Sequence, residues 1–330
     1  MKKILALLLI TLFVGTLLPG CAGSKAEVKT GLAVLTSIAK SKDATADADG
    51  LAQVDSTIVT LTVDEDGKIV QCVIDGAQTK INFNATGQLI TPTNTEFKTK
   101  NELGTAYGMK GVSGIGKEWN EQAATFADYV KGKTIDEVKA IAVDEDTKPT
   151  GSDLKSSVTV SIGGFITAIE KAVANAKSLG AKADDNLKLG VATNIAKSVN
   201  AGEEAGLAQA YSTYTVVTTD ADGKITSCVI DSTQGNVNFD TTGKITSDLT
   251  ASIKTKNELG DSYGMKNASD IGKEWHEQAA AFAEYVKGKT ASEVSGIAVD
   301  EKNHPTDSDL KSSVTVSIGD FKKALAKAIG

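Results

Sequence analysis

The sequence predicts an α+β fold, in which a mostly antiparallel sheet is flanked by helices, and it predicts two tandem copies of that fold. Some segments alternate apolar and polar residues as strands do, whereas others carry apolar residues at helical spacing. A third observation is a long internal repeat: residues 98–134 read KTKNELGTAYGMKGVSGIGKEWNEQAATFADYVKGKT, and residues 254–290 read KTKNELGDSYGMKNASDIGKEWHEQAAAFAEYVKGKT. The offset of 156 residues (254 − 98) is the size of a domain, not of a solenoid unit.

The repeat sets the expected domain boundaries. We expect a signal peptide at 1–20, a lipidated tether at 21–30, a first domain at 31–177, a linker at 178–186 and a second domain at 187–330. About 310 residues after the signal peptide are enough for two domains of ordinary size.

The N-terminus has the pattern of an export signal. Lys2 and Lys3 precede an apolar run over residues 4–14, which is too short to span a bilayer as a permanent helix. The run ends in the residues LPGC, which resemble a bacterial lipobox with Cys21 as the lipidated residue. Two acyl chains would hold the mature chain at the extracytoplasmic face of the cell membrane. An ordinary secretory signal with a chance cysteine is the alternative.

The composition limits the possible partners. The net charge is −7, and because all 35 basic residues are lysines there is no arginine to grip a phosphate with two parallel hydrogen bonds. An acidic surface repels nucleic acid and anionic lipid headgroups, so nucleic acid is excluded as a partner and the lipid must supply the membrane attachment.

The first copy divides into segments of recognisable type. Residues 26–41 resemble a helix. Residues 57–74 predict a β-hairpin, because apolar and polar residues alternate around the turn sequence DEDG at 64–67. Ile81 and Phe83 indicate a further short strand.

The rest of the copy is mainly helical. Residues 116–131 predict an amphipathic helix, and Thr134 with Glu137 forms the capping box of a second helix. Residues 157–162 alternate as a strand does, and residues 165–177 predict a last helix that leads into the linker.

The duplication filters the chemical candidates, since a site used by both copies must appear in both. His276 and His304 correspond to Asn120 and Lys148, so we expect ordinary surface histidines and no shared histidine chemistry. Cys72 and Cys228 are equivalent, but they lack a CxxC partner and are expected to be small buried hydrophobic residues.

Two further features have structural explanations. The turns DEDG and DADG share only a fragment of an EF-hand loop and lack its Glu at position twelve, so no metal site is expected. Tyr107, Met109 and Trp119 recur in the second copy, and core packing is favoured over a wall for ligand stacking.

One chemical motif remains, DLKSSVT, at residues 153–159 and again at 309–315. By pattern alone it is the start of a half-buried strand with hydroxyl groups on its outer face. By its residue pattern and its position ahead of the last helix of each copy, it resembles the flavinylation motif of FMN-binding domains, Asp-x-x-Ser/Thr-Gly-Ala-Thr/Ser. When the family motif is matched to this sequence position by position, its leading Asp corresponds to Asp153 and Asp309. Its first hydroxyl residue corresponds to Ser156 and Ser312, and its flavin attachment residue corresponds to Thr159 and Thr315. Ser157-Val158 and its copy stand where the family has Gly-Ala.

With its lipobox, paired domains and YGM…IGKEW segments, the chain resembles the two-domain flavinylated lipoproteins of extracellular electron transfer in Gram-positive bacteria. The resemblance implies FMN bound covalently to Thr159 and Thr315 by a flavin transferase. It implies an electron carrier rather than an enzyme with its own substrate, which takes electrons from a membrane quinone or dehydrogenase and passes them to extracellular acceptors. The alternative is a surface-binding or adhesive lipoprotein that uses its repeat for avidity. A hydrolase would need a nucleophile–base pair that neither copy shows.

Overall fold

The structure is a computed structural model that describes residues 26–330. The expected signal peptide and Cys21 lie outside these residues. Within the described part of the chain, no helix is long and apolar enough to cross a membrane.

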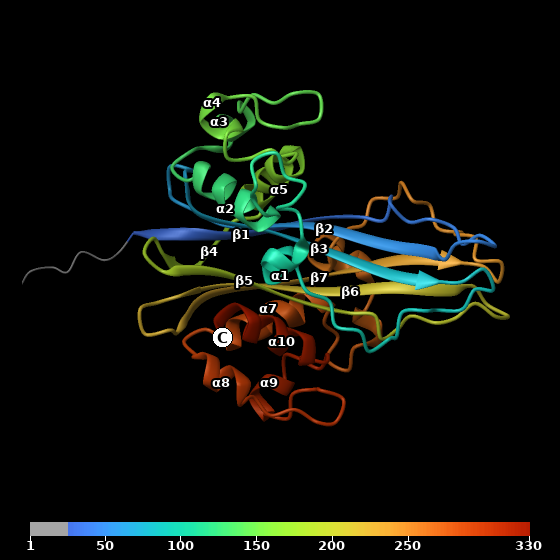
Figure 1. Cartoon of the computed structure of the whole chain (residues 1–330). Helices are drawn as coiled ribbons and strands as arrows, with labels where there is room; N and C mark the ends of the chain where they lie inside the picture. The colour runs from blue at the N-terminus through green and yellow to red at the C-terminus, as the bar shows by residue number, and fades with distance from the viewer. Residues whose placement is uncertain (1–25) are drawn as a thin grey trace, which may run out of the picture.

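The fold is α+β, and its two antiparallel sheets lie face to face between two outer layers of helices (Figure 1). The first sheet has the strand order β3-β2-β1-β4, and the second has the order β5-β6-β7. The strands are β1 (Glu27–Ser37), β2 (Gly50–Val63), β3 (Ile69–Phe83), β4 (Lys177–Lys182), β5 (Asn186–Asn194), β6 (Gly206–Thr219) and β7 (Ile225–Phe239).

The longer helices that follow each hairpin pack on the outer face of its own sheet. The first layer holds α1 (Lys100–Leu103), the 3₁₀ turn η1 (Gly104–Tyr107), α2 (Trp119–Tyr129), α3 (Ile135–Lys139), α4 (Ser152–Lys155) and α5 (Gly163–Ala174). The second layer holds α6 (Lys256–Leu259), η2 (Gly260–Tyr263), η3 (Lys266–Ala268), α7 (Trp275–Tyr285), α8 (Ala291–Ser295), α9 (Ser308–Lys311) and α10 (Gly319–Ile329). Apart from the additional η3, the same order of elements therefore follows both hairpins.

The predicted hairpin is confirmed, but it is longer than expected. β2 pairs with β3 along its whole length, and Gly67, at φ 76°, closes the turn between them. Ile81 and Phe83 do not form a separate strand as expected, because they pair with the start of β2 and continue β3.

The expected helix over residues 26–41 is wrong, because this segment is strand β1. Leu32, Ala33 and Val34 are consecutive and all buried, since helix α5 covers one face of the strand and the second sheet covers the other. A strand buried on both faces does not alternate between apolar and polar residues, so its sequence resembles a buried helix.

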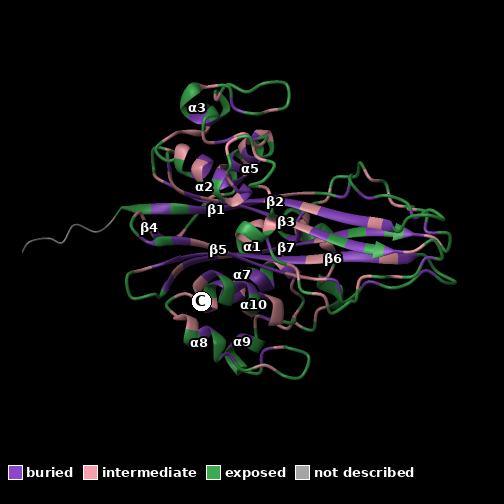
Figure 2. Cartoon of the chain, viewed as in Figure 1, coloured by how far each residue is buried: buried purple, intermediate pink, exposed green. Residues whose placement is uncertain are grey.

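Burial on both faces also applies to strand β2 and its threonines. Thr60 and Thr62 have the spacing of a solvent-facing side, yet both are fully buried in the sandwich. Hydroxyl pairs cross between the sheets there: Thr30 Oγ1 lies 2.8 Å from Ser227 Oγ, and the Tyr214 hydroxyl donates to Ser56 Oγ at 3.2 Å. The seam between the sheets is therefore part apolar and part hydroxyl-lined (Figure 2).

Contacts between the two halves occur in equivalent pairs. The Ala44 N–H donates to the Gly243 carbonyl and the Ala201 N–H to the Gly87 carbonyl, both at 2.8 Å. Lys171 pairs with Glu258, and Lys327 pairs with Glu102 at 2.8 Å. The two halves thus meet through the same surface used twice, as in a twofold dimer.

Part of the expected linker, residues 178–186, forms strand β4. This strand pairs with β1 at the edge of the first sheet and leads through a short turn into β5. The connection is therefore ordered backbone within the sheet.

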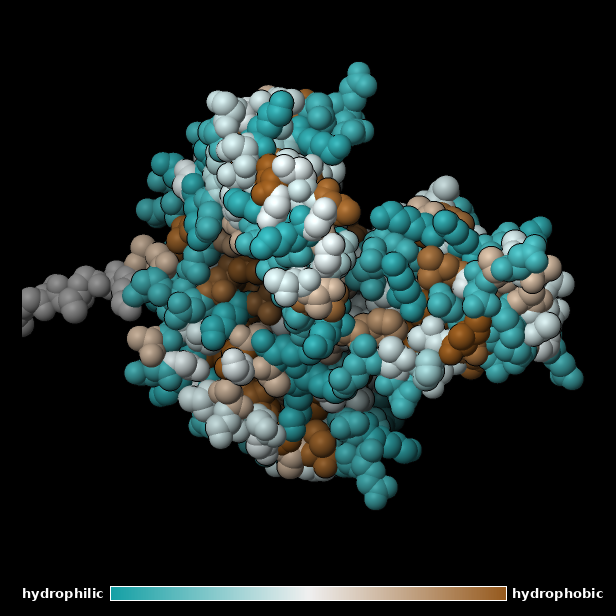
Figure 3. Space-filling model, viewed as in Figure 1, coloured by the Kyte–Doolittle hydropathy of each residue, from teal (hydrophilic) through white to brown (hydrophobic). Residues whose placement is uncertain are grey.

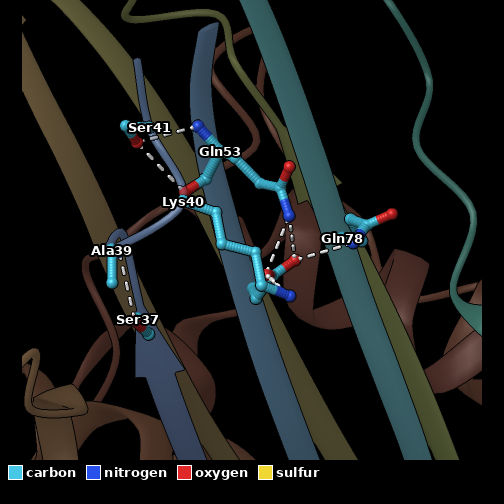
Figure 4. A network of polar contacts seen from close by, with 7 residues as sticks. Ser37, Ala39, Lys40, Ser41, Gln53 and Gln78 are labelled. Carbon is cyan, nitrogen blue, oxygen red and sulfur yellow. Dashed lines mark hydrogen bonds and ion pairs between the residues drawn. The ribbon is translucent and has the colours of Figure 1, made fainter.

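A polar network in the first half has no counterpart in the second. Asp55 accepts hydrogen bonds from Gln53 and Gln78 and pairs with Lys40 at 3.2 Å (Figure 4). Tyr211 stands at the equivalent position of β6 and instead bonds to Lys256. The visible surface is mainly hydrophilic, with hydrophobic residues in a recess between the two helical layers and in small patches elsewhere (Figure 3).

Candidate functional site

The segment that carries Thr159 is irregular, so the expected strand over residues 157–162 is wrong. Val158 and Ile162 are fully buried in the core of the first half and anchor the segment at two points. Thr159, between them, is half-buried. The apolar spacing correctly predicts burial, but it comes from two buried residues of a loop and not from a hydrogen-bonded strand.

A buried glutamine of helix α2 replaces the missing strand partner. Gln122 Oε1 accepts hydrogen bonds from the backbone N–H groups of Thr159 (2.7 Å) and Val160 (3.2 Å), and from Thr159 Oγ1 (3.2 Å). Its Nε2 group donates to Ser113 Oγ at 3.2 Å and to the Lys117 carbonyl at 3.3 Å. Gln122 is fully buried, so its amide positions the Thr159 hydroxyl without competition from water.

The second half repeats this arrangement. Gln278 Oε1 accepts from Thr315 N (2.8 Å), Thr315 Oγ1 (3.2 Å) and Val316 N (3.1 Å). Sequence reasoning missed both glutamines. The available signal was a polar residue on the apolar face of an amphipathic helix, between Trp119 and Ala123 and repeated in the second copy.

The Thr315 side chain lines a cavity of about 480 Å³ on the outer layer of the second half. Ligand sites in proteins are usually about 300–1,000 Å³ in volume. The cavity is lined by Met265, Ala268, Ser269, Asp270, Gln278, Asp300, His304, Pro305, Thr306, Lys311, Val314, Thr315 and Val316.

The acidic residue of the motif lies elsewhere. Asp153 accepts a hydrogen bond from the Tyr129 hydroxyl at 2.9 Å, and this bond raises the pKa of Tyr129. Asp153 lines a different cavity, beside α3, and Ser156 is exposed at the end of α4. Thr159 instead contacts Gln122, so these three residues of the predicted site are not grouped around one cavity.

Asp309 and Ser312 likewise do not line the Thr315 cavity. The Asp309 carbonyl accepts a hydrogen bond from Ser312 Oγ at 2.7 Å, within the short helix α9. In both halves the acid and the first serine of the motif therefore shape the helical turn before the threonine.

The aromatic cluster belongs mainly to the core, as expected. Trp119 packs edge-to-face on Phe165, and Trp275 packs in the same way on Phe321. Met265 alone of the second cluster lines the cavity.

The aromatic rings also enclose a lysine, which the sequence did not suggest. Lys256 Nζ lies 4.4–4.8 Å from the ring centroids of Tyr211, Tyr263 and Trp275. Burial lowers the pKa of Lys256 to about 7.

His304 is a partly exposed surface residue, as expected, whereas His276 is not. His304 lines the Thr315 cavity, and its Nδ1 lies 3.1 Å from Asp300 Oδ2. His276 is half-buried, and its Nδ1 is covered and has no hydrogen-bond partner among the described residues. The expectation of a surface histidine is therefore wrong for His276 alone, and the duplication excludes only histidine chemistry that both halves would share.

The cysteines and acidic turns are as expected. Cys72 and Cys228 are free and buried, and burial raises the pKa of the Cys72 thiol to about 12, so it stays protonated at neutral pH. Asp64 and Asp220 each accept the backbone N–H group four residues later, which closes the hairpin turns.

Comparison with known proteins adds little to this geometry. A chlorophenol reductase of Desulfitobacterium hafniense is 56% identical to this chain over 41 residues, which is 12% of this chain and 12% of the reductase. The chain thus spans about an eighth of the relative it matches. No family model and no solved structure matches the chain.

Proposed function

We propose that the protein is a membrane-anchored electron carrier with two FMN-binding-like domains, each with FMN esterified to its motif threonine, Thr159 or Thr315. The observation that carries the proposal is the repeated Gln–Thr contact, which presents a half-buried threonine hydroxyl in both halves and, in the second, at a cavity of about 480 Å³.

The motif differs from the family pattern at two positions in each half, and the residues at both positions are compatible with the proposal. Ser157 and Ser313 stand where the family has glycine, and neither has a positive φ, so neither backbone position needs glycine. Val158 and Val314 stand where the family has alanine, and both are accommodated in the core.

The contacts suggest what the residues contribute to attachment. Gln122 holds the Thr159 backbone and accepts its hydroxyl proton in a hydrogen bond, so the oxygen keeps its lone pairs free. An amide oxygen is too weak a base to remove that proton, so a transferase must supply the base. The bound FMN would supply the redox chemistry, whereas the protein supplies attachment and environment.

The location of the threonines suggests two separate sites. Thr159 follows α4 and Thr315 follows α9, and these helices lie in opposite outer layers (Figure 1). Each flavin would face its own side of the sandwich. The lipid on Cys21 would keep both beside a membrane donor, a quinone or dehydrogenase.

Co-expression with a flavin transferase tests the proposal. The protein is expected to fluoresce in a denaturing gel, and Thr159→Ala and Thr315→Ala are each expected to remove half of the signal. Thr167→Ala, a change at an exposed position of α5 in the same half and away from the motif and the lining positions, is the control. A colourless protein that binds a defined surface partner would favour the adhesive alternative.

A further inference from the structure

The two candidate sites share most of their residues but differ in charge. At the thirteen positions that line the Thr315 cavity, the first half has the same residue type at ten. The three differences, second half to first, are Ala268 to Val112, Asp270 to Gly114 and His304 to Lys148. Only the last two alter charged or titratable groups.

The carboxylate of Asp270 is a charge that the first half lacks and that no neighbouring group among residues 26–330 pairs with. Its side chain lines the cavity and has no hydrogen-bond or ion-pair partner among the described residues. Gly114, its counterpart, places no charge there.

Lys148 and His304, the other titratable difference, each lie beside a carboxylate. Lys148 Nζ pairs with Asp146 Oδ2 at 3.1 Å, so a carboxylate already balances its charge. His304 Nδ1 lies 3.1 Å from Asp300 Oδ2, so a carboxylate also lies beside the histidine. Neither Lys302 nor Asp146, its equivalent in the first half, is at a position that lines the cavity.

The other charged residues that line the cavity are the same in both halves. Lys155 and Lys311 are equivalent, and so are Asp144 and Asp300, whose carboxylates each accept two backbone N–H groups. Among the lining residues, Asp270 is therefore the one carboxylate that the second half has and the first half lacks.

We propose that Asp270 makes the second site less able to hold negative charge than the first, so that the first half is the stronger electron acceptor. This rests on the proposed function. A flavin that takes up two electrons and one proton gains one negative charge, which the Asp270 carboxylate opposes at Thr315 and nothing equivalent opposes at Thr159. Electrons from a two-electron donor, which is oxidised in the same step, collect on the first half.

The charge difference can be measured without flavin. Thr159→Cys and Thr315→Cys, each in a full-length chain with Cys21→Ser, place a thiol at each threonine position, and the pH dependence of alkylation by iodoacetamide gives its acidity. The native thiols are buried. At low ionic strength the acid dissociation constant is expected to be about two- to fivefold larger at position 159, because one nearby charge in water has this effect, and the ratio falls with added salt.

Reciprocal variants provide matched controls. Asp270→Gly is expected to raise the acidity at position 315 towards that at 159, and Gly114→Asp to lower the acidity at 159. Gly114 has no atom within 4 Å of where a Cβ would stand and is not in the left-handed region, so the fold tolerates the change. Equal acidities in the unaltered chain, or no response to Asp270→Gly, would overturn the inference.

Redox titration of loaded protein tests the functional consequence. Thr315→Ala leaves the first half loaded and Thr159→Ala the second, and dithionite is the two-electron donor. The first half is expected to have the higher midpoint potential, by about 10–20 mV for the same two- to fivefold ratio. Equal or reversed potentials would overturn the inferred order of the sites. If the thiols differ but no flavin is attached, the charge asymmetry stands and the proposed function is wrong.

Discussion

Phe83 and Phe239, at the ends of β3 and β7, stack with ring centroids 4.2 Å apart and ring planes 5° apart. The two residues are equivalent in the repeat, because they differ by 156 in number. The same phenylalanine of each half therefore packs against its equivalent in the other half. This stack joins the two sheets at the end of the sandwich that lies away from the helices (Figure 1).

We predict that Phe83→Ala and Phe239→Ala each lower the free energy of unfolding by about 3–5 kcal/mol, as deletion of a buried ring usually does. Because the rings contact each other, the double variant is expected to lose less than the sum, with a coupling of about 0.5–1.5 kcal/mol. Urea unfolding of all four proteins measures this. Additive losses would show that the stack adds nothing beyond burial.

Removal of the buried amide is predicted to affect one site at a time. Gln122→Ala leaves the N–H groups of Thr159 and Val160 without their acceptor, which costs about 1–3 kcal/mol. We expect flavin attachment to fail at Thr159 and to continue at Thr315, as measured by the mass of proteolytic fragments. Gln278→Ala is the matched control with the opposite pattern. Normal loading of both threonines in both variants would exclude a positioning role.

Two buried carboxyl groups make stability depend on acidic pH. Burial raises the pKa of Asp75 and of Asp231 to about 6. Between pH 4 and 6 the folded protein binds more protons than the unfolded chain, so these groups lower stability as the pH rises through this window. Asp75→Asn keeps a side-chain acceptor for the N–H groups of Gly76 and Asn101.

The stability of Asp75→Asn relative to the unaltered protein is therefore expected to increase from pH 4 to 6, by an amount of the order of 1–3 kcal/mol. Denaturant unfolding at each pH measures it, with the exposed Asp66→Asn as control. A difference independent of pH would contradict the buried-carboxyl account.

The enclosed lysine has the opposite dependence at alkaline pH. Since the folded-state pKa of Lys256 is lowered to about 7 and its unfolded value is about 10.4, the unfolded chain binds more protons between these limits. Stability is thus predicted to rise with pH from 7 towards 10 through this group, and Lys256→Met removes that contribution. Lys100→Met is the comparison, since Lys100 occupies the equivalent place but is half-buried. An unchanged slope in Lys256→Met would contradict the prediction.

Elements with local signals were predictable from the sequence, and elements defined by distant partners were not. The turn at Gly67 and the Thr134–Glu137 capping box follow from neighbouring residues, and both are present. β1 was mistaken for a helix because its second face is covered by a sheet from the other half of the chain, which its own residues do not reveal.

The candidate site shows the same limit. The repeat singled out Thr159 and Thr315, but it could not show that Gln122 and Gln278, 37 residues earlier, hold them. It also removed His304 from consideration, although His304 lines the cavity of its own half. Comparison of two copies detects what they share and misses how they differ.

The central claim, that Thr159 and Thr315 carry flavin on a lipid-anchored chain, is tested most directly by the intact mass of the native protein from its membrane. The account predicts a chain that begins at Cys21, with its lipid and two FMN phosphoesters, and with one flavin fewer in each of Thr159→Ala and Thr315→Ala. A mature chain whose mass is accounted for by its amino acids and lipid alone would contradict it.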